Sequence, residues 1–309
     1  MNDQPGRQSV VPLASVHYED LVRRELATDL GAAGDLTTDA IVPSDLEVQA
    51  QIVTRQDGRV CGLPCALFAF QALGTVRFRT EQADGTDVAA GTVLAELAGP
   101  ARVLLSAERT ALNLLTHLSG VATVTRDLVD AVALVSTGRV VCTRKTTPGL
   151  RALEKYAVRV GGASNHRFGL HDAILIKDNH RFIAGGVGAA IARARALQRH
   201  LVRLEVEVDS LDELKEALDA GADVVLLDNM SPATMRDAVK LTAGRAPLEA
   251  SGGINLDTVT EIAHTGVDFI SVGSLTHAAI RYANQPDTTR LEGHFEICSL
   301  IGTLECAAP

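Results

Sequence analysis

A regular alternation of apolar, strand-like runs with capped helical segments constrains the fold of this chain most. Six apolar runs begin near residues 140, 173, 204, 223, 247 and 268. The helical segments between them have recognisable starts, since SLDE at 210–213 has the pattern of a capping box and Ser231-Pro232 is typical of a first helical turn. Strands that alternate with helices predict parallel βα units. Because six strands are fewer than eight, we expect an incomplete barrel, with an open doubly wound sheet as the alternative.

The first half of the chain has a different rhythm. A helical pattern opens at Ser15 and ends at Gly31, and short alternating runs follow at 48–53, 75–80 and 93–97. Alternation of this kind predicts an antiparallel sheet with one covered face. A long helical region then runs from Ser106 to about residue 135.

Composition restricts the function classes. The 309 residues include 46% hydrophobic residues but no Trp, so the core must consist of Ala, Val, Leu and Ile, which favours α/β layers. A net charge of -9 argues against nucleic acid and anionic membranes as partners. The chain has no apolar run of spanning length and its start has no apolar secretion segment, so we expect a cytoplasmic protein.

Basic residues concentrate in one part of this acidic chain. Residues 139–180 hold eight Arg or Lys against three acidic residues. Three of these bases, Arg151, Lys155 and Arg159, recur at helical spacing and suit a solvated helix face. The bases at 144, 145 and 177 border strand-like runs instead, which indicates a pocket for an anion rich in phosphate or carboxylate.

Polar residues stand at the carboxyl end of nearly every predicted strand, where a βα barrel places its active site. In chain order they are Thr143, Arg144, Lys145, Lys177, Glu207, Asp228, Ser251, Gly252, Gly253, Gly273 and Ser274. The last two turns, SGG and VGS, are expected to bind phosphate, although their glycines could simply make tight turns. Glu207 and Asp228 could hold a hydrated Mg²⁺ or stabilise a developing positive charge, or merely pair with Lys177 or Arg144. We prefer Glu207 to Glu205 because it is nearer the strand end.

His166 and Arg167 lie in a loop rich in glycine, GGASNHRFG. His166 could donate a hydrogen bond to an acidic substrate, or it could be structural.

Several phrases of the chain, taken together, resemble the quinolinate phosphoribosyltransferases, which are type II phosphoribosyltransferases. The matching segments run in order from residue 34 to 277 and are GDLTTDAIVP, LLSAERTALNLLTHLSG, TRKTTPGLRALEKYAV, NHRFGLHDAILIKDNH, LEVEVDS, LLDN, LEASGGI and GVDFISVGSLTH. The resemblance implies an N-terminal α/β sandwich followed by an incomplete α/β barrel. We accordingly expect segments at 13–118, 119–276 and 277–309, the last an atypical tail that could pack on the N-terminal domain.

The resemblance also implies an activity and a site. The enzyme would transfer phosphoribosyl from phosphoribosyl pyrophosphate to quinolinate with decarboxylation, giving nicotinate mononucleotide, pyrophosphate and CO₂. Arg109 would reach the site of the neighbouring subunit in a homodimer or hexamer. Lys145, Glu207 and Asp228 are the catalytic candidates, and Glu207 and Asp228 would meet Mg²⁺ and the ribose. The substrate-binding set is Arg109, Thr143, Arg144, Lys145, His166, Arg167, Lys177, Glu207, Asp228, Ser251, Gly252, Gly253, Val272, Gly273 and Ser274.

The chain departs from the family pattern in three places: Cys142 replaces a common Asp, Thr147 replaces a frequent Leu, and the chain after His277 is longer and less regular than usual. Three other interpretations stay open. They are a related phosphoribosyltransferase-like protein that takes another base, a catalytically silent ligand-binding protein on the same fold, and a Schiff-base aldolase that uses Lys145 or Lys177. Retention of Lys177 argues against the first.

Overall fold

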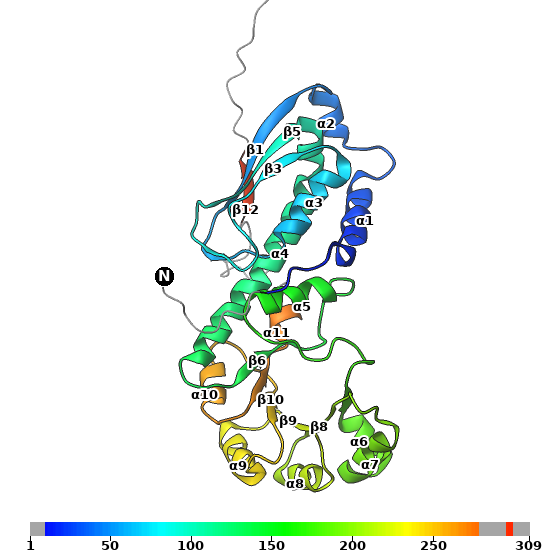
Figure 1. Ribbon diagram of the computed structural model, residues 1–309, viewed down its shortest axis with the longest axis vertical. Coiled ribbons are helices and arrows are strands. Elements are labelled where there is room, and N and C mark those ends of the chain that lie inside the picture. The colour runs from blue at the N-terminus through cyan, green and yellow to red at the C-terminus, as the bar shows by residue number, and fades with distance from the viewer. Residues whose placement is uncertain (1–9, 278–294, 299–309) are drawn as a thin grey trace, which may run out of the picture. The chain divides into compact units, whose positions relative to one another are not determined.

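A computed structural model describes residues 10–277 and 295–298 of the chain (Figure 1). The chain divides into two compact units. The first contains residues 1–123, 148–161 and 279–309, and the second contains 124–147 and 162–278. The long helix α4 (Ala101–Ala133) therefore contributes to both units, and α5 (Arg151–Val160) belongs to the first. The predicted segments 13–118, 119–276 and 277–309 stay predictions, and most of the tail lies outside the described residues.

The first unit is built on an antiparallel sheet with the strand order β12-β1-β5-β3. Its strands are β1 (Glu47–Thr54), β3 (Arg77–Arg79), β5 (Val93–Pro100) and β12 (Phe295–Cys298), and a two-stranded ribbon pairs β2 (Gly58–Arg59) with β4 (Asp87–Val88). Its other helices are η1 (Ser15–His17), α1 (Glu19–Leu30), α2 (Leu36–Ile41) and α3 (Leu63–Leu73). The three alternating runs of the sequence are therefore strands of one antiparallel sheet, as predicted.

One face of this sheet is covered and the other is open, which the alternation in β1 explains. Ala50, Ile52 and Thr54 are buried, whereas the residues between them are only half-buried. The ribbon drawings show α3 and the first part of α4 behind the sheet (Figure 1). Helix α3 is apolar nearly all round and buries Phe70 completely, as a helix packed on several sides must.

The second unit contains six parallel strands in the order β6-β11-β10-β9-β8-β7. They are β6 (Arg139–Val141), β7 (Ile174–Ile176), β8 (Leu204–Val208), β9 (Val224–Asp228), β10 (Leu248–Ser251) and β11 (Phe269–Ser271). Neighbours from β7 to β11 are consecutive in sequence, and the first strand pairs with the last. A doubly wound sheet would reverse direction partway across. The order is therefore that of an α/β barrel left unpaired between β6 and β7, as predicted.

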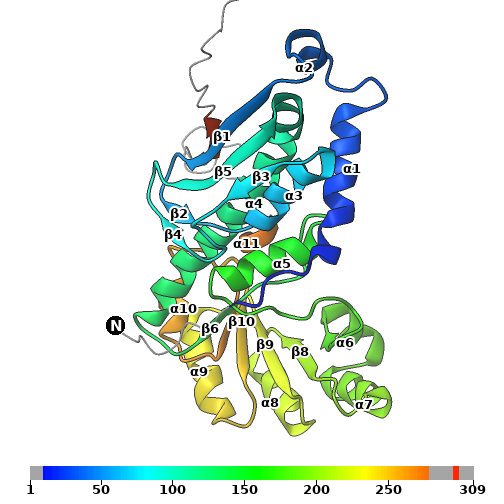
Figure 2. The same ribbon diagram turned by 45° about the horizontal axis from the view of Figure 1, so that its top comes forward.

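Helices follow each strand from β7 to β11, and those that connect successive strands lie outside the sheet (Figure 2). They are α6 (Asp178–Ala184), α7 (Val187–Leu197), α8 (Leu211–Asp219), α9 (Pro232–Thr242), α10 (Val259–Ala263) and α11 (Ser274–His277). Ser210 accepts a hydrogen bond from the Glu213 amide, and Ser231 accepts one from the Thr234 amide, so both predicted caps are confirmed. Side-chain caps thus set where α8 and α9 begin.

Three local expectations are wrong. Lys155 does not lie on a solvated face: it is 1% exposed and its neighbour Glu154 is fully buried, because α5 packs within the first unit on nearly all sides. Helix α4 starts at Ala101 rather than Ser106. Helix α1 begins at Glu19 with Tyr18 as its cap, so Ser15 only opens a short 3₁₀ turn.

Cys61, Cys65 and Cys142 are buried, and Cys142 Sγ donates to Asn165 Oδ1 at 3.3 Å. In the described part of the chain, none of the helices is both long and apolar enough to cross a membrane.

Candidate active site

The predicted polar residues of the second unit meet at one edge of its sheet. Parallel strands place their carboxyl ends together, so the residues that end each strand become neighbours although they are far apart in the sequence. Glu207 lies in the last part of β8, Asp228 ends β9 and Ser251 ends β10. The remaining members follow directly on β6, β7 and β11 and are Thr143, Arg144, Lys145, Lys177, Val272, Gly273 and Ser274.

The turn after β6 is fixed from two sides. The Lys145 amide donates to Thr143 Oγ1 at 3.0 Å, and Thr276 Oγ1 donates to the Lys145 carbonyl oxygen at 2.6 Å. The second bond joins this turn to α11, which follows the adjacent strand β11. The Lys145 side chain is exposed, so the backbone is held while the ammonium group faces solvent.

Two arginines of the site are placed close together. The Nε atoms of Arg144 and Arg167 are both buried and have no hydrogen-bond partner. Burial lowers the pKa of Arg167, and the neighbouring charge of Arg144 lowers it further. Arg167 also donates from Nη1 to the Ala173 carbonyl oxygen at 3.2 Å, which fixes its direction. Two partly desolvated like charges with free donors are the arrangement that an anionic ligand stabilises.

The carboxylates at the strand ends have different partners. Lys177 Nζ donates to Glu207 Oε2 at 2.6 Å, and the Glu207 side chain is only 10% exposed. Asp228 Oδ2 accepts from Asn229 Nδ2 at 2.8 Å. Glu207 lies beside Leu226 in the parallel register. Asp228 is two residues beyond Leu226 on the same strand, so its side chain points to the same face of the sheet as that of Glu207. Both carboxylates therefore point to the barrel interior at its carboxyl end. The Lys177–Glu207 ion pair is the alternative interpretation that the sequence left open for Glu207, and no bond of this kind joins Glu207 to Arg144 among the described contacts.

The turn after β10 requires its glycines. Gly252 has a φ of +108°, and a Cβ there would lie 2.2 Å from Asn229 Oδ1 and 3.0 Å from Asn229 Cα. Gly253 has a φ of +61°, and a Cβ there would meet nothing within 4 Å, so this side of the turn is open. After β11, Val272 is fully buried, whereas Gly273 and Ser274 are half-buried. Backbone packing thus explains Gly252, and the open space at Gly253 leaves room for a ligand.

His166 is held by protein atoms at both ring nitrogens. Nε2 lies 2.9 Å from Glu205 Oε2 and 3.6 Å from Glu249 Oε1, and Nδ1 accepts from the Arg167 amide at 2.7 Å. Burial lowers the pKa of His166, but the hydrogen bond to Glu205 and the charge of Glu249 outweigh it and raise the pKa overall. Sequence reasoning set Glu205 aside and overlooked Glu249. The sequence does contain a pattern that indicates both glutamates, because each lies two residues before a predicted site residue and so points to the same face of its strand.

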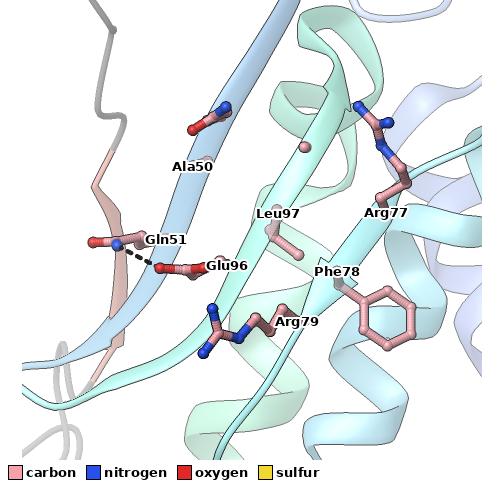
Figure 3. Close-up of a pocket in the computed structure, with 9 residues that line it drawn as sticks. Ala50, Gln51, Arg77, Phe78, Arg79, Glu96 and Leu97 are labelled. Carbon is pink, nitrogen blue, oxygen red and sulfur yellow. Dashed lines mark hydrogen bonds between the residues drawn. The ribbon is translucent and has the colours of Figure 1, made fainter.

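Arg109 belongs to the first unit, where it is an exposed residue of α4. Its contribution to a site stays a prediction. The first unit also has a hollow of about 390 Å³ on the open face of its sheet, among residues of β1, β3 and β5 (Figure 3). Arg77, Phe78, Arg79 and Glu96 line it, and Gln51 Nε2 donates to Glu96 Oε1 at 3.4 Å. None of the predicted site residues lines this hollow.

Two family models match most of the chain. "Quinolinate phosphoribosyl transferase, N-terminal domain" matches residues 35–119, and "Quinolinate phosphoribosyl transferase, C-terminal domain" matches residues 121–281.

Curated relatives and solved structures agree with these models. The probable nicotinate-nucleotide pyrophosphorylase (carboxylating) of Bacillus subtilis is 43% identical over 93% of this chain and 99% of its own length. The corresponding enzyme of Mycobacterium leprae is 45% identical over 84% and 93%. The structure of the nicotinate-nucleotide pyrophosphorylase from Francisella tularensis superposes with a TM-score of 0.82 at 40% identity, covering 88% of this chain and 96% of that one.

Proposed function

The chain belongs to the quinolinate phosphoribosyltransferase family, and from this membership we propose how its own residues carry out the family's reaction. It is a pentosyltransferase that moves the phosphoribosyl group of phosphoribosyl pyrophosphate to quinolinate with decarboxylation. The products are nicotinate mononucleotide, pyrophosphate and CO₂, which places the enzyme in the synthesis of NAD.

The observation that carries the assignment of the site is the adjacent pair Arg144 and Arg167. Their buried, unpartnered Nε atoms form an anion site at the carboxyl edge of the barrel. Quinolinate is a dianion, so its two carboxylates can pair with both guanidinium groups and with Lys145 nearby. Thr143 Oγ1 accepts a hydrogen bond from the Lys145 amide and so stabilises the same turn. This arrangement favours a dicarboxylate over a monoacid, which would leave one buried cation unpaired.

The chemistry needs charge stabilisation rather than a covalent intermediate. As pyrophosphate leaves, the anomeric carbon of the ribose gains oxocarbenium character. The carboxylates of Glu207 and Asp228 stabilise the positive charge that develops there. The quinolinate nitrogen then bonds to that carbon, and the ring becomes cationic. The carboxylate beside the nitrogen leaves as CO₂, its bonding electrons enter the cationic ring, and a proton from water replaces it. Lys177, paired with Glu207, is placed to hold this carboxylate or a phosphate.

The two phosphate-bearing parts of the cosubstrate fit the remaining strand ends. The turns at Ser251–Gly253 and Val272–Ser274 would bind the 5′-phosphate, with backbone amides as donors. Glu207 and Asp228 offer the hard oxygen ligands that Mg²⁺ prefers, and few protein ligands suffice when phosphates complete its shell. When bound, Mg²⁺ would neutralise the pyrophosphate leaving group. His166 would stand beside the quinolinate site as a neighbour of Arg167 rather than as a free donor.

Oligomerisation completes the proposal. Arg109 is exposed on α4, and the family resemblance assigns it to the quinolinate site of a neighbouring subunit in a homodimer or hexamer. A cytoplasmic location also stays a prediction.

The decisive experiment is turnover by the purified protein with Mg²⁺, phosphoribosyl pyrophosphate and either quinolinate or nicotinate. We expect CO₂ and nicotinate mononucleotide from quinolinate, and nicotinate should be a very poor substrate. Comparable rates with the two acids would contradict the dicarboxylate site and favour a related enzyme with another base. Absence of turnover with both would favour a silent binding protein.

A further inference from the structure

Beneath the candidate active site lies a buried cluster of His166, Glu205 and Glu249. Their side chains are 13%, 10% and 6% exposed. Glu205 stands two residues before Glu207 on β8, and Glu249 stands two residues before Ser251 on β10. Since strand residues two apart share a face and lie about 7 Å apart, the two glutamates form the next layer down in the barrel interior. The carboxylates of both residues face His166.

The hydrogen bonds of His166 fix which nitrogen carries the proton. The Arg167 amide can only donate, and it points at Nδ1 from 2.7 Å. This bond requires an unprotonated Nδ1, so it opposes the second protonation that the neighbouring carboxylates favour, and the single ring proton lies on Nε2. From Nε2 it is donated to Glu205 Oε2, with Glu249 Oε1 on the far side. The ligand atoms of these residues lie within 4.8 Å of one another. Nevertheless, an Nε2 that carries a proton has no lone pair for a metal.

We propose that Glu205 and Glu249 are positioning residues that hold His166 in its Nε2–H tautomer, so that its Nδ1 fixes the Arg167 backbone and aims that guanidinium at the substrate carboxylate. The inference rests on the proposed function for the identity of the substrate. Its geometric part, from Glu205 through His166 to the Arg167 amide, stands on distances within one unit.

Glu205 also acts on Arg167 through its charge. Arg144 disfavours the charged form of Arg167, whereas the charges of Glu205 and Asp172 favour it. Asp172 also accepts from the amides of Phe168 at 2.6 Å and Gly169 at 2.9 Å, so the loop is tied on the other side of Arg167 as well. The negative charge of Glu205 offsets part of the repulsion between the two guanidinium groups, and no hydrogen bond joins Glu205 to Arg167 among the described contacts. The Nε donor of Arg167 stays available for an anion.

The first test compares Glu205→Leu with Glu205→Gln. Leucine removes the acceptor of the His166 proton, whereas glutamine keeps an oxygen in that position. We expect Glu205→Leu to raise the KM for quinolinate about 10- to 100-fold, the range typical of residues that orient a ligand-binding group. The KM for phosphoribosyl pyrophosphate should change less than about threefold, and Glu205→Gln should recover most of the loss.

The second test does not depend on activity. Nitrogen-15 NMR of the histidine rings in the substrate-free protein reports the tautomer, and the His166 signal is identified by its absence in His166→Gln. Wild type and Glu205→Leu should differ: we expect the Nε2–H form in the first, and a mixture of tautomers in the second. Absence of turnover by the wild-type protein would refute the proposed function, while the tautomer measurement would still decide the positioning role.

A matched control is available in the first unit. Glu154 is fully buried and lies 3.0 Å from His117 Nε2, so Glu154→Leu removes a carboxylate–histidine pair of the same kind. It should lower stability without changing the His166 tautomer or the balance of the two KM values. Equal increases in both KM values for the Glu205 and Glu154 variants, or an unchanged tautomer in Glu205→Leu, would overturn the proposal. So would displacement of the Nε2 proton in wild type by added Zn²⁺, because it would make the cluster a metal site.

Discussion

At the scale of single residues, Gly252 and Gly253 separate two constraints that require glycine, a positive φ and a lack of space for a Cβ atom. Both have positive φ, but only Gly252 has an atom of Asn229 where its Cβ would be. Gly253→Ala should cost about 1 kcal/mol of unfolding free energy, for backbone strain alone. Gly252→Ala should cost about 3 kcal/mol or more, because Asn229 or the turn must also move. Urea denaturation of both variants measures the difference, and equal costs would show that the turn adapts freely.

Glu249 links stability to pH. Burial raises its pKa from 4.5 to about 7, with the charge of Glu205 as a second cause. Between these values the folded protein keeps a proton that the unfolded chain has lost, so the stabilising contribution is complete below pH 4.5 and is lost as pH rises through about 7. Glutamine mimics the protonated form at every pH.

The unfolding free energy of Glu249→Gln should therefore rise relative to that of wild type as the pH increases, by on the order of 2 kcal/mol at pH 8. Unfolding free energies at pH 4.5, 6, 7 and 8 test this. Glu96→Gln, at an exposed position of β5, is the control and should show no such trend. A constant difference across the series would mean that Glu249 is ionised throughout.

Residue types predicted the rim of the site better than its interior. Bases and acids at strand ends were recognisable because their position alone is informative in a parallel sheet. The helical spacing of Arg151, Lys155 and Arg159 predicts a solvated face wrongly for Lys155, because this spacing is the same whether a helix faces water or packs on all sides. Glu205 and Glu249 show the converse: the alternation in LEVEV gives their direction, but only the folded barrel brings β8, β10 and the His166 loop together.

At the scale of elements, the two ends of β9 carry aspartates with different tasks. Asp228 closes the carboxyl end and lies at the candidate site, whereas Asp223 precedes the strand and accepts from Arg195 at 2.7 Å and from the Leu204 amide at 2.7 Å. In α/β barrels the carboxyl ends of the strands carry chemistry and the amino ends carry stability. Replacing Asp by Asn should therefore affect catalysis at the carboxyl end of β9 and stability at its amino end.

Asp228→Asn and Glu207→Gln should each lower kcat by the equivalent of about 2–4 kcal/mol of barrier, since they remove charge that matters most in the transition state. Quinolinate binding should weaken much less. Asp223→Asn should lower the thermal midpoint and leave kcat within about twofold. Steady-state kinetics with equilibrium binding of quinolinate provides the comparison, and unchanged kcat in both site variants would make the carboxylates structural.

The order of elements was the most predictable level of the structure. All six parallel strands and both caps, at Ser210 and Ser231, follow from local patterns of burial and capping. The closure between β6 and β11 was less accessible, because it depends on how the whole sheet coils. The strand order, once known, excludes the doubly wound alternative.

At the scale of the whole molecule, the division into two units separates Arg109 from every other predicted site residue. All the others belong to the second unit, while Arg109 lies on the part of α4 in the first. Sequence motifs alone cannot decide whether such a residue serves its own chain or another. The family resemblance favours the neighbouring subunit, and if Arg109 acts there as we propose, activity requires an oligomer.

Mixed oligomers of two inactive variants test this condition. Arg109→Ala and Lys177→Ala should each abolish activity alone, because every site then lacks one of the two side chains. If Arg109 acts across the interface, a mixed dimer contains one site with both residues and one with neither, so activity should recover to about half of wild type. Recovery requires subunit exchange, which is verified by two different affinity tags. If Arg109 serves its own chain, each site of the mixed dimer keeps one defect, and verified mixed dimers stay inactive.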